Sequence, residues 1–485
     1  GNMCGIIGVI SNEEVTPTIL EVLGKLEYRG YDSAGLATIQ NSRIERRRAK
    51  GKIKNLEVLV KEKPLSGHIG IGHTRWATHG APSKTNAHPH QKGSLVGVHN
   101  GIIENFREIK TELESEGYKF DSETDTEVVI QLCAYYLDLG YNIEKAFKST
   151  LDRLQGAFAL CFMFVEDQEK LFVSRRGAPL VVGYGKSSMF VGSDAVSLSH
   201  LIDEVTFLEE DDWAIVGRKG INIFNKSGIK TNRAKKRIEK DFGSIGKGNY
   251  QHFMLKEMHE QSEVLSYATA SFINYKSSRV EMLEGLNDIK SINRLILVAC
   301  GTAYYACAVA KYWFEKYAKI PVEIDVASEF RYRDSILEAN DYAIFVSQSG
   351  ETADTLAALR KVKGKVKKII SIINVMESSI ARDSDFVLPI KAGPEIGVAS
   401  TKAFTSQLAV LASIVIYMAN NRGHLSSAEN SELIDALMSA PRLISDVLTK
   451  EEEFKNFSMK LEHATSALFL GRGSLYPLAL EAALK

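Results

Sequence analysis

The order of apolar and polar positions divides the chain into two halves of different character. From Asn293 onward, short continuous apolar runs alternate with segments of helical pattern. Such a run is typical of a parallel strand that is buried on both faces. The runs that predict strands are 295–300, 322–327, 342–346, 368–375 and 386–391. Strands that alternate with helices predict an α/β fold with a doubly wound parallel sheet, flavodoxin-like in broad class.

In the first half, polar side chains gather in glycine-containing turns between strand-like runs. These turns are 28–35, 73–80, 98–105 and 122–127. Functional side chains are often carried on turns that a rigid scaffold positions. The first half is therefore expected to hold a site built from several turns.

Cys4 lies almost at the start of the chain. Gly1 and Asn2 are interpreted as an expression remnant, and a methionine before a small residue is normally removed. Cys4 would then be N-terminal in the natural protein, with a nucleophilic sulfur and an α-amine on one carbon. The α-amine has an unperturbed pKa of about 7.7–8.0, so it can accept a proton near neutral pH. Taken alone, Cys4 would more simply be a small core residue.

The turns also contain groups suited to a glutamine substrate, which carries a carboxylate, an ammonium group and an amide. Arg75 offers a planar fork for a carboxylate, and Asp125 offers the opposite charge. Attack on the amide creates an oxyanion, which needs fixed hydrogen-bond donors. In isolation, Arg75 would be a surface ion pair and Asn100-Gly101 a hairpin turn.

Taken in order, these motifs resemble the N-terminal-nucleophile glutaminase domain of glutamine amidotransferases. The resemblance implies an α+β fold, an α/β/β/α sandwich, with Cys4 as the nucleophile. It also implies that Asn100 and the backbone N–H of Gly101 form the oxyanion hole. The residues that it implies for binding glutamine are Arg75, Trp76, Thr78, His79 and Asp125.

Five histidines between positions 73 and 99 raise the alternative of a metal site. Zinc sites usually combine Cys and His at recognisable pair spacings. The chain has neither a C-x-x-C nor an H-E-x-x-H motif, so no metal is predicted.

Two turns of the second half are rich in hydroxyl groups. Residues 347–352 (SQSGET) follow one predicted strand, and 300–302 (CGT) follow another. Backbone N–H groups and hydroxyls at a helix N-terminus can bind a phosphate. Each hydroxyl alone could equally be an ordinary helix N-cap. Two such turns at corresponding strand ends favour a phosphate site.

This half resembles the sugar isomerase domain, a phosphosugar-binding module. The run 395–404 is similar to a substrate loop of the glutamine–fructose-6-phosphate aminotransferase family. The residues that the resemblance implies for the sugar phosphate are Thr302, Ser347, Gln348, Ser349, Thr352, Val398 and Ala399.

The expected domains are a glutaminase domain at 4–241, a linker at 242–250 and a first sugar isomerase domain at 251–440. Residues 295–310 and 468–485 share a strand, turn and helix pattern, which predicts that a second sugar isomerase domain starts within 451–485 and is truncated. Glu481 and Lys485 match family residues near the sugar. This chain alone is therefore expected to lack synthase activity.

Composition limits the function classes. The 485 residues contain 60 Lys plus Arg and 60 Asp plus Glu, so no net charge favours nucleic acid or an anionic membrane. The basic run 46–48 is expected to be a solvated face. The five cysteines are odd in number and lack paired spacing, which indicates a reducing compartment. No apolar run reaches membrane-spanning length. We expect a cytoplasmic protein without nucleic-acid or membrane partners.

The resemblance implies an amidotransferase of amino-sugar biosynthesis. It would convert glutamine and fructose 6-phosphate to glutamate and glucosamine 6-phosphate, without a metal, nucleotide or redox cofactor. A homodimer through the sugar isomerase domains is implied. The alternatives are another N-terminal-nucleophile amidotransferase or a non-catalytic phosphosugar-binding fragment. An asparagine synthetase would need an S-G-G-x-D-S loop, and a phosphoribosyl amidotransferase would need paired acids after a strand. Neither is found.

Overall fold

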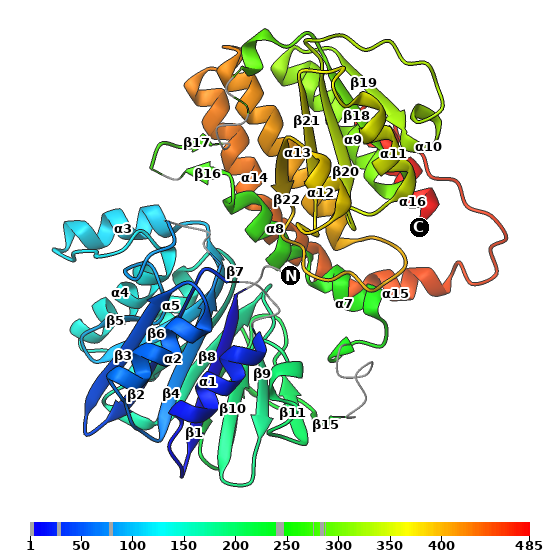
Figure 1. Cartoon of the computed structure of the whole chain (residues 1–485). Helices are drawn as coiled ribbons and strands as arrows, with labels where there is room; N and C mark the ends of the chain where they lie inside the picture. Colours follow the sequence, from blue (N-terminus) through cyan, green and yellow to red (C-terminus); the bar gives the residue numbers. More distant parts are fainter. Residues whose placement is uncertain are drawn as a thin grey trace. The chain divides into compact units, whose positions relative to one another are not determined.

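The computed structural model describes residues 4–26, 31–76, 81–238, 247–274, 276–281, 286 and 288–485. The chain forms two compact units. Unit 1 contains Gly1–Ser266 and Pro441–Thr449, and unit 2 contains Tyr267–Ala440 and Lys450–Lys485. Figure 1 shows the elements of each unit.

Unit 1 is built on two antiparallel sheets. Among the described residues, the first has the strand order β15-β11-β9-β10-β1-β4-β2-β3 and the second β14-β13-β12-β8-β7-β6-β5. The strands of the first sheet are β1 (Gly5–Ser11), β2 (Ser33–Gln40), β3 (Arg43–Lys50), β4 (Ile69–Arg75), β9 (Val181–Tyr184), β10 (Ser188–Gly192), β11 (Glu204–Phe207) and β15 (Lys235–Arg237). Those of the second are β5 (His90–Lys92), β6 (Leu95–Ile103), β7 (Gly156–Phe164), β8 (Asp167–Arg176), β12 (Trp213–Gly217), β13 (Gly220–Phe224) and β14 (Lys230–Thr231).

The main core of unit 1 lies between these sheets. Ile6 and Ile71 from the first sheet pack with Val98 and Val173 from the second. Alternate residues of β1, such as Ile7, face the opposite way, toward helices α1 (Thr16–Lys25) and α2 (Ile53–Glu62). Helices α3 (Phe106–Ser115), α4 (Asp125–Asp138) and α5 (Ile143–Arg153) belong to the second sheet's outer layer, and Phe147 of α5 packs on Phe162 with ring centroids 5.4 Å apart. This is the predicted α/β/β/α sandwich.

Unit 2 contains a parallel sheet of the order β19-β18-β20-β21-β22 among the described residues. The strands are β18 (Leu295–Ala299), β19 (Val322–Val326), β20 (Tyr342–Ser347), β21 (Lys368–Ile373) and β22 (Phe386–Pro389). Ile296 and Phe345 pack against α10 (Ala327–Phe330), α11 (Ala353–Val362) and α12 (Ser379–Asp383). Helix α9 (Gly301–Trp313) contacts α13 (Lys402–Asn421). The predicted parallel α/β sheet is confirmed.

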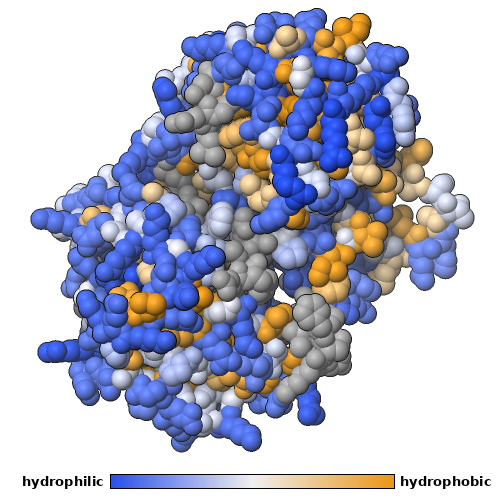
Figure 2. Space-filling model, viewed as in Figure 1, coloured by the Kyte–Doolittle hydropathy of each residue, from blue (hydrophilic) through white to orange (hydrophobic). Residues whose placement is uncertain are grey.

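The remaining helices and the short hairpin complete the described elements. They are α7 (Phe253–His259), α8 (Gln261–Ala270), α14 (Ser427–Leu448), α15 (Glu451–Met459), α16 (Leu475–Leu484), β16 (Ile273–Asn274) and β17 (Arg279–Val280). The chain passes from unit 1 to unit 2 within α8, returns to unit 1 within α14 and enters unit 2 again after Thr449. Apolar residues occupy smaller patches than hydrophilic ones on the face in Figure 2.

Helices α7 and α8 meet at Glu260. One sequence expectation about secondary structure was wrong. The strand expected near 468 does not form, although the following helix does, as α16. Leu468 and Leu470 are each 89% exposed, and no strand among the described residues pairs with them. An apolar run without a neighbouring strand cannot satisfy its backbone groups by pairing.

Among the described residues, α13 is the one helix whose length and hydropathy would allow it to cross a membrane. Within unit 2, 67% of the most apolar window of this helix is buried. Burial of this kind is typical of a helix in a protein core.

Candidate active site

Cys4 immediately precedes β1 and is 5% exposed. Gly5 pairs with Thr74 of the antiparallel neighbour β4, so Cys4 lies beside the end of that strand. The backbone N–H of Trp76 donates to the Cys4 Sγ at 3.2 Å. The register of two strands thus fixes the position of the sulfur.

Asn100 and Gly101 lie on β6 of the facing sheet. The Asn100 Nδ2 donates to the Cys4 carbonyl oxygen at 3.2 Å. Gly101 has φ +105°, and a Cβ there would lie 2.1 Å from the carbonyl oxygen of Ala157. A side chain at this position would therefore clash as well as strain the backbone. The structure brings together the residues predicted for catalysis.

Arg75 and Asp125 are both buried, and each is 3% exposed. Arg75 is the last residue of β4, and Asp125 is the first residue of α4. The helix begins there because the Thr124 side chain accepts the Glu127 N–H. The Asp125 Oδ2 accepts the N–H of Ile103 at 2.9 Å.

Burial is the largest influence on both charges. It raises the pKa of Asp125 to about 7, against the opposing effects of the Ile103 N–H and Arg75. It lowers the pKa of Arg75, while Asp32, Cys4 and Asp125 act in the other direction. A ligand that carries both an ammonium and a carboxylate group would offer each residue an opposite charge.

Of the other residues predicted to bind glutamine, Trp76 lies next to Arg75 and contacts Cys4 through its backbone. Its side chain is partly buried. Thr78 and His79 lie outside the described residues.

A buried histidine cluster lies behind Asn100 and was not predicted as such. His73, His88, His90 and His99 are each 4% exposed or less. The His73 and His88 rings stack, with centroids 4.0 Å apart and planes 10° apart. The density of histidines in the sequence was the available signal, but it suggested a metal. Within the described residues, no three His, Cys, Asp or Glu side chains are arranged to hold a metal ion.

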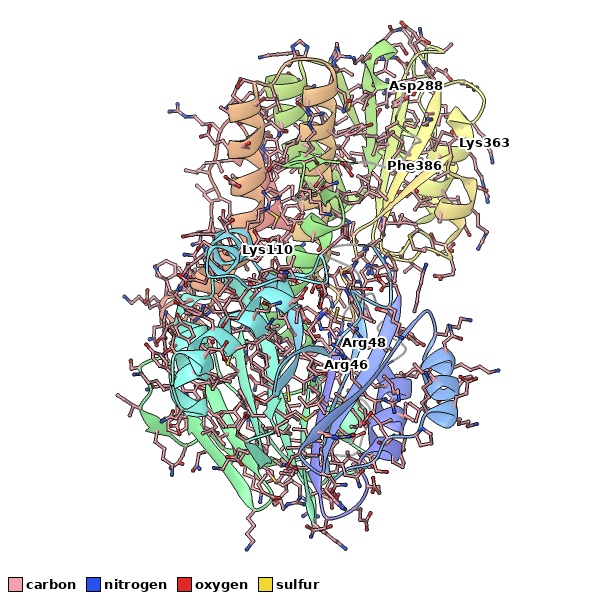
Figure 3. The ribbon with its side chains drawn as sticks, turned by 90° about the vertical axis from the view of Figure 1, so that its left-hand side faces the viewer. Arg46, Arg48, Lys110, Asp288, Lys363 and Phe386 are labelled. Atoms are coloured by element: carbon pink, nitrogen blue, oxygen red, sulfur yellow. The ribbon has the colours of Figure 1, made fainter. Side chains whose placement is uncertain are left out.

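The basic run 46–48 is not the solvated face that the sequence suggested. Arg46 and Arg48 lie on β3 (Figure 3). The Arg46 Nη1 donates to the Pro89 carbonyl at 3.1 Å, and the Arg48 Nη1 donates to the Ala87 carbonyl at 3.1 Å. Burial lowers the pKa of Arg48 to about 10. These arginines hold the segment that contains His88, because its carbonyls need donors.

The candidate sugar-phosphate residues lie at the carboxyl ends of adjacent parallel strands of unit 2. Thr302 follows β18, Ser347 ends β20, and these strands pair directly. The Ser347 Oγ lies 3.0 Å from the Thr352 Oγ1 and accepts the Gly350 N–H at 3.1 Å. Ligands of open α/β sheets bind at this edge.

Backbone constraints shape the turn 347–352. Gly350 has φ +68°, and a Cβ there would lie 2.0 Å from the Ser378 Oγ. The Ser349 Oγ accepts the Glu351 N–H at 3.2 Å, and the Gln348 carbonyl accepts the Asn374 N–H at 3.1 Å. The turn is therefore tied to the end of the next strand as well as to α11.

Thr302 is also joined to the C-terminal helix of unit 2. Its Oγ1 donates to the Glu481 Oε1 at 3.1 Å and accepts from the Lys485 Nζ at 2.7 Å. Glu481 and Lys485 therefore contact Thr302, one of the residues predicted for the sugar phosphate. Val398, in the loop before α13, is fully exposed, and Ala399 beside it is partly buried.

Comparison with known proteins gives the family. Residues 73–200 match the glutamine amidotransferase domain family, and residues 288–417 match the SIS domain family. The chain is 50% identical over 483 residues to the isomerizing glutamine–fructose-6-phosphate aminotransferase of Brucella suis, covering 100% of this chain and 80% of the relative. The chain belongs to the glutamine–fructose-6-phosphate aminotransferase family.

Another member of this aminotransferase family, from Mesorhizobium japonicum, is also 50% identical, with the same coverage of 100% and 80%. A solved structure, the C-terminal domain of glucosamine-fructose-6-phosphate aminotransferase from Francisella tularensis, is 39% identical. The match covers 49% of this chain and 66% of the solved Francisella chain, with a TM-score of 0.47. Both sequence resemblances are confirmed by the family assignment.

The buried Asp125 of this aminotransferase family member predicts a pH-dependent stability difference. Folding raises the pKa of Asp125 from 3.8 to about 7. Its contribution to the free energy of unfolding is therefore fully present below pH 4 and is lost as the pH rises through 7. A rise in the pKa from 3.8 to about 7 corresponds to about 4 kcal/mol in the free energy of unfolding. We expect Asp125→Asn to remove this loss, so that its melting temperature relative to the wild type rises between pH 5 and pH 8.

Thermal melts of both proteins at several pH values measure the difference. The control is Asp121→Asn, which changes an exposed acid four residues before Asp125. A constant gap between Asp125→Asn and the wild type from pH 5 to pH 8 would contradict the raised pKa.

Proposed function

We propose that this chain supplies the glutaminase and phosphosugar-binding parts of a glutamine-dependent aminotransferase, which converts fructose 6-phosphate and glutamine to glucosamine 6-phosphate and glutamate. The names of its relatives support this function. The observation that carries it is the contact between Cys4 and Asn100 in unit 1, beside a buried arginine and aspartate. This arrangement provides a nucleophile, an oxyanion donor and two charges suited to an amino acid.

The proposed first step is attack by the Cys4 sulfur on the side-chain amide carbon of glutamine. The Cys4 α-amine accepts the thiol proton and passes it to the leaving nitrogen, which departs as ammonia. The oxyanion of the tetrahedral intermediate is bound by the Asn100 Nδ2 and the Gly101 N–H. Water then hydrolyses the thioester and releases glutamate, while the ammonia passes internally to fructose 6-phosphate and supplies the amino group of glucosamine 6-phosphate.

Arg75 and Asp125 are proposed to bind the ends of the amino acid, with Trp76, Thr78 and His79 completing the pocket. Arg75 would pair with the carboxylate. Asp125, whose pKa is raised to about 7 by burial, would pair with the ammonium group. The ammonium group of glutamine stabilises the ionised form of the Asp125 carboxyl, so glutamine binding and Asp125 ionisation favour each other.

The sugar phosphate is proposed to bind at Thr302 and the turn 347–352, where Ser347, Gln348, Ser349 and Thr352 supply polar groups. Support comes from the position of this turn at the start of the ten-residue helix α11. Helix N-termini attract anions through free N–H groups and the helix dipole. Val398 and Ala399 would line the sugar.

The finer assignments also remain proposals. We propose domain limits of 4–241, 251–440 and 451–485, with a linker at 242–250. We also propose a homodimer through the sugar isomerase domains and a cytoplasmic location. Neither a nucleic acid nor a membrane is proposed as a partner.

Replacing the nucleophile should remove glutamine hydrolysis. We expect Cys4→Ala to lower glutamate release by at least about 10³-fold, because no other group can form the thioester. Binding of fructose 6-phosphate, measured by calorimetry, should not change. Cys133→Ala is the control, since this buried cysteine lies within α4 and has no proposed role. Glutamine turnover that survives in Cys4→Ala would exclude the assignment.

The state of the Cys4 nitrogen should control the rate. A version that starts at Gly1 has an amide at this position, which cannot accept the thiol proton. We expect it to hydrolyse glutamine about 10²–10⁴-fold more slowly than a version that starts at Cys4. Glutamate release at neutral pH compares the two, and equal rates would show that another group activates the sulfur.

Removing two hydroxyls should weaken phosphate binding. We expect the double variant Ser347→Ala, Thr352→Val to bind fructose 6-phosphate at least about 10²-fold more weakly, because hydrogen bonds to charged groups contribute about 1.5–3 kcal/mol each. Ser384→Ala is the matched control, because the Ser384 hydroxyl donates only to the Ile380 carbonyl at the end of α12 among the contacts described. Calorimetry measures both, and unchanged affinity in the double variant would mean that these hydroxyls serve the turn alone.

A further inference from the structure

The oxyanion donor Asn100 is held by a partner that has no role in the proposed reaction. The His73 Nε2 lies 3.0 Å from the Asn100 Oδ1, and both residues are buried. The Asn100 Nδ2 donates to the Cys4 carbonyl oxygen, which can only accept. The amide oxygen must therefore face His73, and the His73 Nε2 must carry the proton.

The His73 ring is itself held by stacking on His88, with the ring centroids 4.0 Å apart. The backbone N–H of His99 donates to the His88 Nδ1 at 3.4 Å. Burial lowers the pKa of His88 well below its ordinary value, so the ring is neutral and its proton lies on Nε2. This Nε2 faces the Thr126 Oγ1 at 3.3 Å.

Thr126 closes the network. Its hydroxyl accepts from the His88 Nε2 and can therefore donate to the His99 Nδ1, which lies 2.9 Å away. Thr126 is the second residue of α4 and directly follows Asp125. One chain of neutral contacts thus runs from the helix that carries Asp125 to the amide of Asn100.

Resting on the proposed function, we propose that His73 is a positioning residue for glutamine hydrolysis. It fixes the Asn100 amide so that Nδ2 faces the oxyanion, and the stack on His88, locked by Thr126, fixes His73. An unheld amide could rotate by 180° and present its oxygen to the developing negative charge. Fixed donors matter because they require no reorganisation during the reaction.

The test compares two substitutions at His73 in the version that starts at Cys4. Leu fills similar space without a donor, whereas the Gln side chain can place an N–H where the His73 Nε2 lies. We expect His73→Leu to lower kcat for glutamate release about 10- to 100-fold, with KM changed less than about threefold. We expect His73→Gln to recover most of this loss.

A second readout separates positioning from general damage. Alkylation of Cys4 by iodoacetamide forms no oxyanion, so its rate should stay within about twofold of the wild type in both variants. Peptide mass spectrometry locates the label. The proposal is overturned if His73→Leu keeps the wild-type kcat, if His73→Gln loses as much as His73→Leu, or if alkylation falls in parallel with kcat.

The Thr126 pair tests the network if His73→Leu does not fold. Thr126→Val loses the bridging hydroxyl and Thr126→Ser keeps it. We expect kcat at least about threefold lower in Thr126→Val than in Thr126→Ser, with equal alkylation rates, and equal kcat values would overturn the network. An inactive wild type would refute the proposed glutaminase function itself, whereas an active wild type with unaffected variants would refute this inference alone.

Discussion

The antiparallel register of β1 against β4 is the constraint on which the candidate glutaminase site depends. Gly5 faces Thr74, so Cys4 reaches the Trp76 N–H and lies beside Arg75. His73 and Arg75 are two residues apart on β4 and therefore point to the same face of the sheet. A shift of one residue would turn both side chains to the opposite face. The positions of Cys4, Arg75 and His73 thus all depend on the register of β1 against β4.

The second sheet and α4 contribute the other groups of the candidate site. Burial then determines the charge state of these groups. Asn100 comes from β6, and Asp125 comes from the first turn of α4. In this dry region an ionised carboxyl is costly, which is why the pKa of Asp125 rises to about 7. The histidines nearby avoid the same cost by staying neutral. A zwitterionic ligand would therefore enter a site with few charged groups, where Arg75 can pair with its carboxylate and Asp125 with its ammonium group.

Much of the fold was predictable because local sequence and environment agree. The strands of unit 2 are buried on both faces, so their continuous apolar runs gave their positions to within two residues, as for β18 and β20. Leu468 and Leu470 show the limit of this reasoning, since an apolar run becomes a strand only beside a partner strand. The candidate site residues were predictable through ordered motifs. Their support was not, because the contacts of His73 with Asn100 and of Arg48 with Ala87 join positions 27 and 39 residues apart.

The two candidate sites also differ in how they are held, which follows from the chemistry proposed for each. At Asn100, buried and uncharged groups restrict one amide, because an oxyanion exists only briefly and gains most from donors already in place. At Ser347 and Thr352, short hydroxyl and backbone contacts shape a turn at a sheet edge, with Gly350 allowing its backbone to approach Ser378. A phosphate is charged before it binds, so the N–H groups of a helix N-terminus and nearby hydroxyls suffice to bind it. The catalytic half of the proposed reaction thus depends on a rigidly held buried amide, and the phosphate-binding half on a turn at the carboxyl end of a strand.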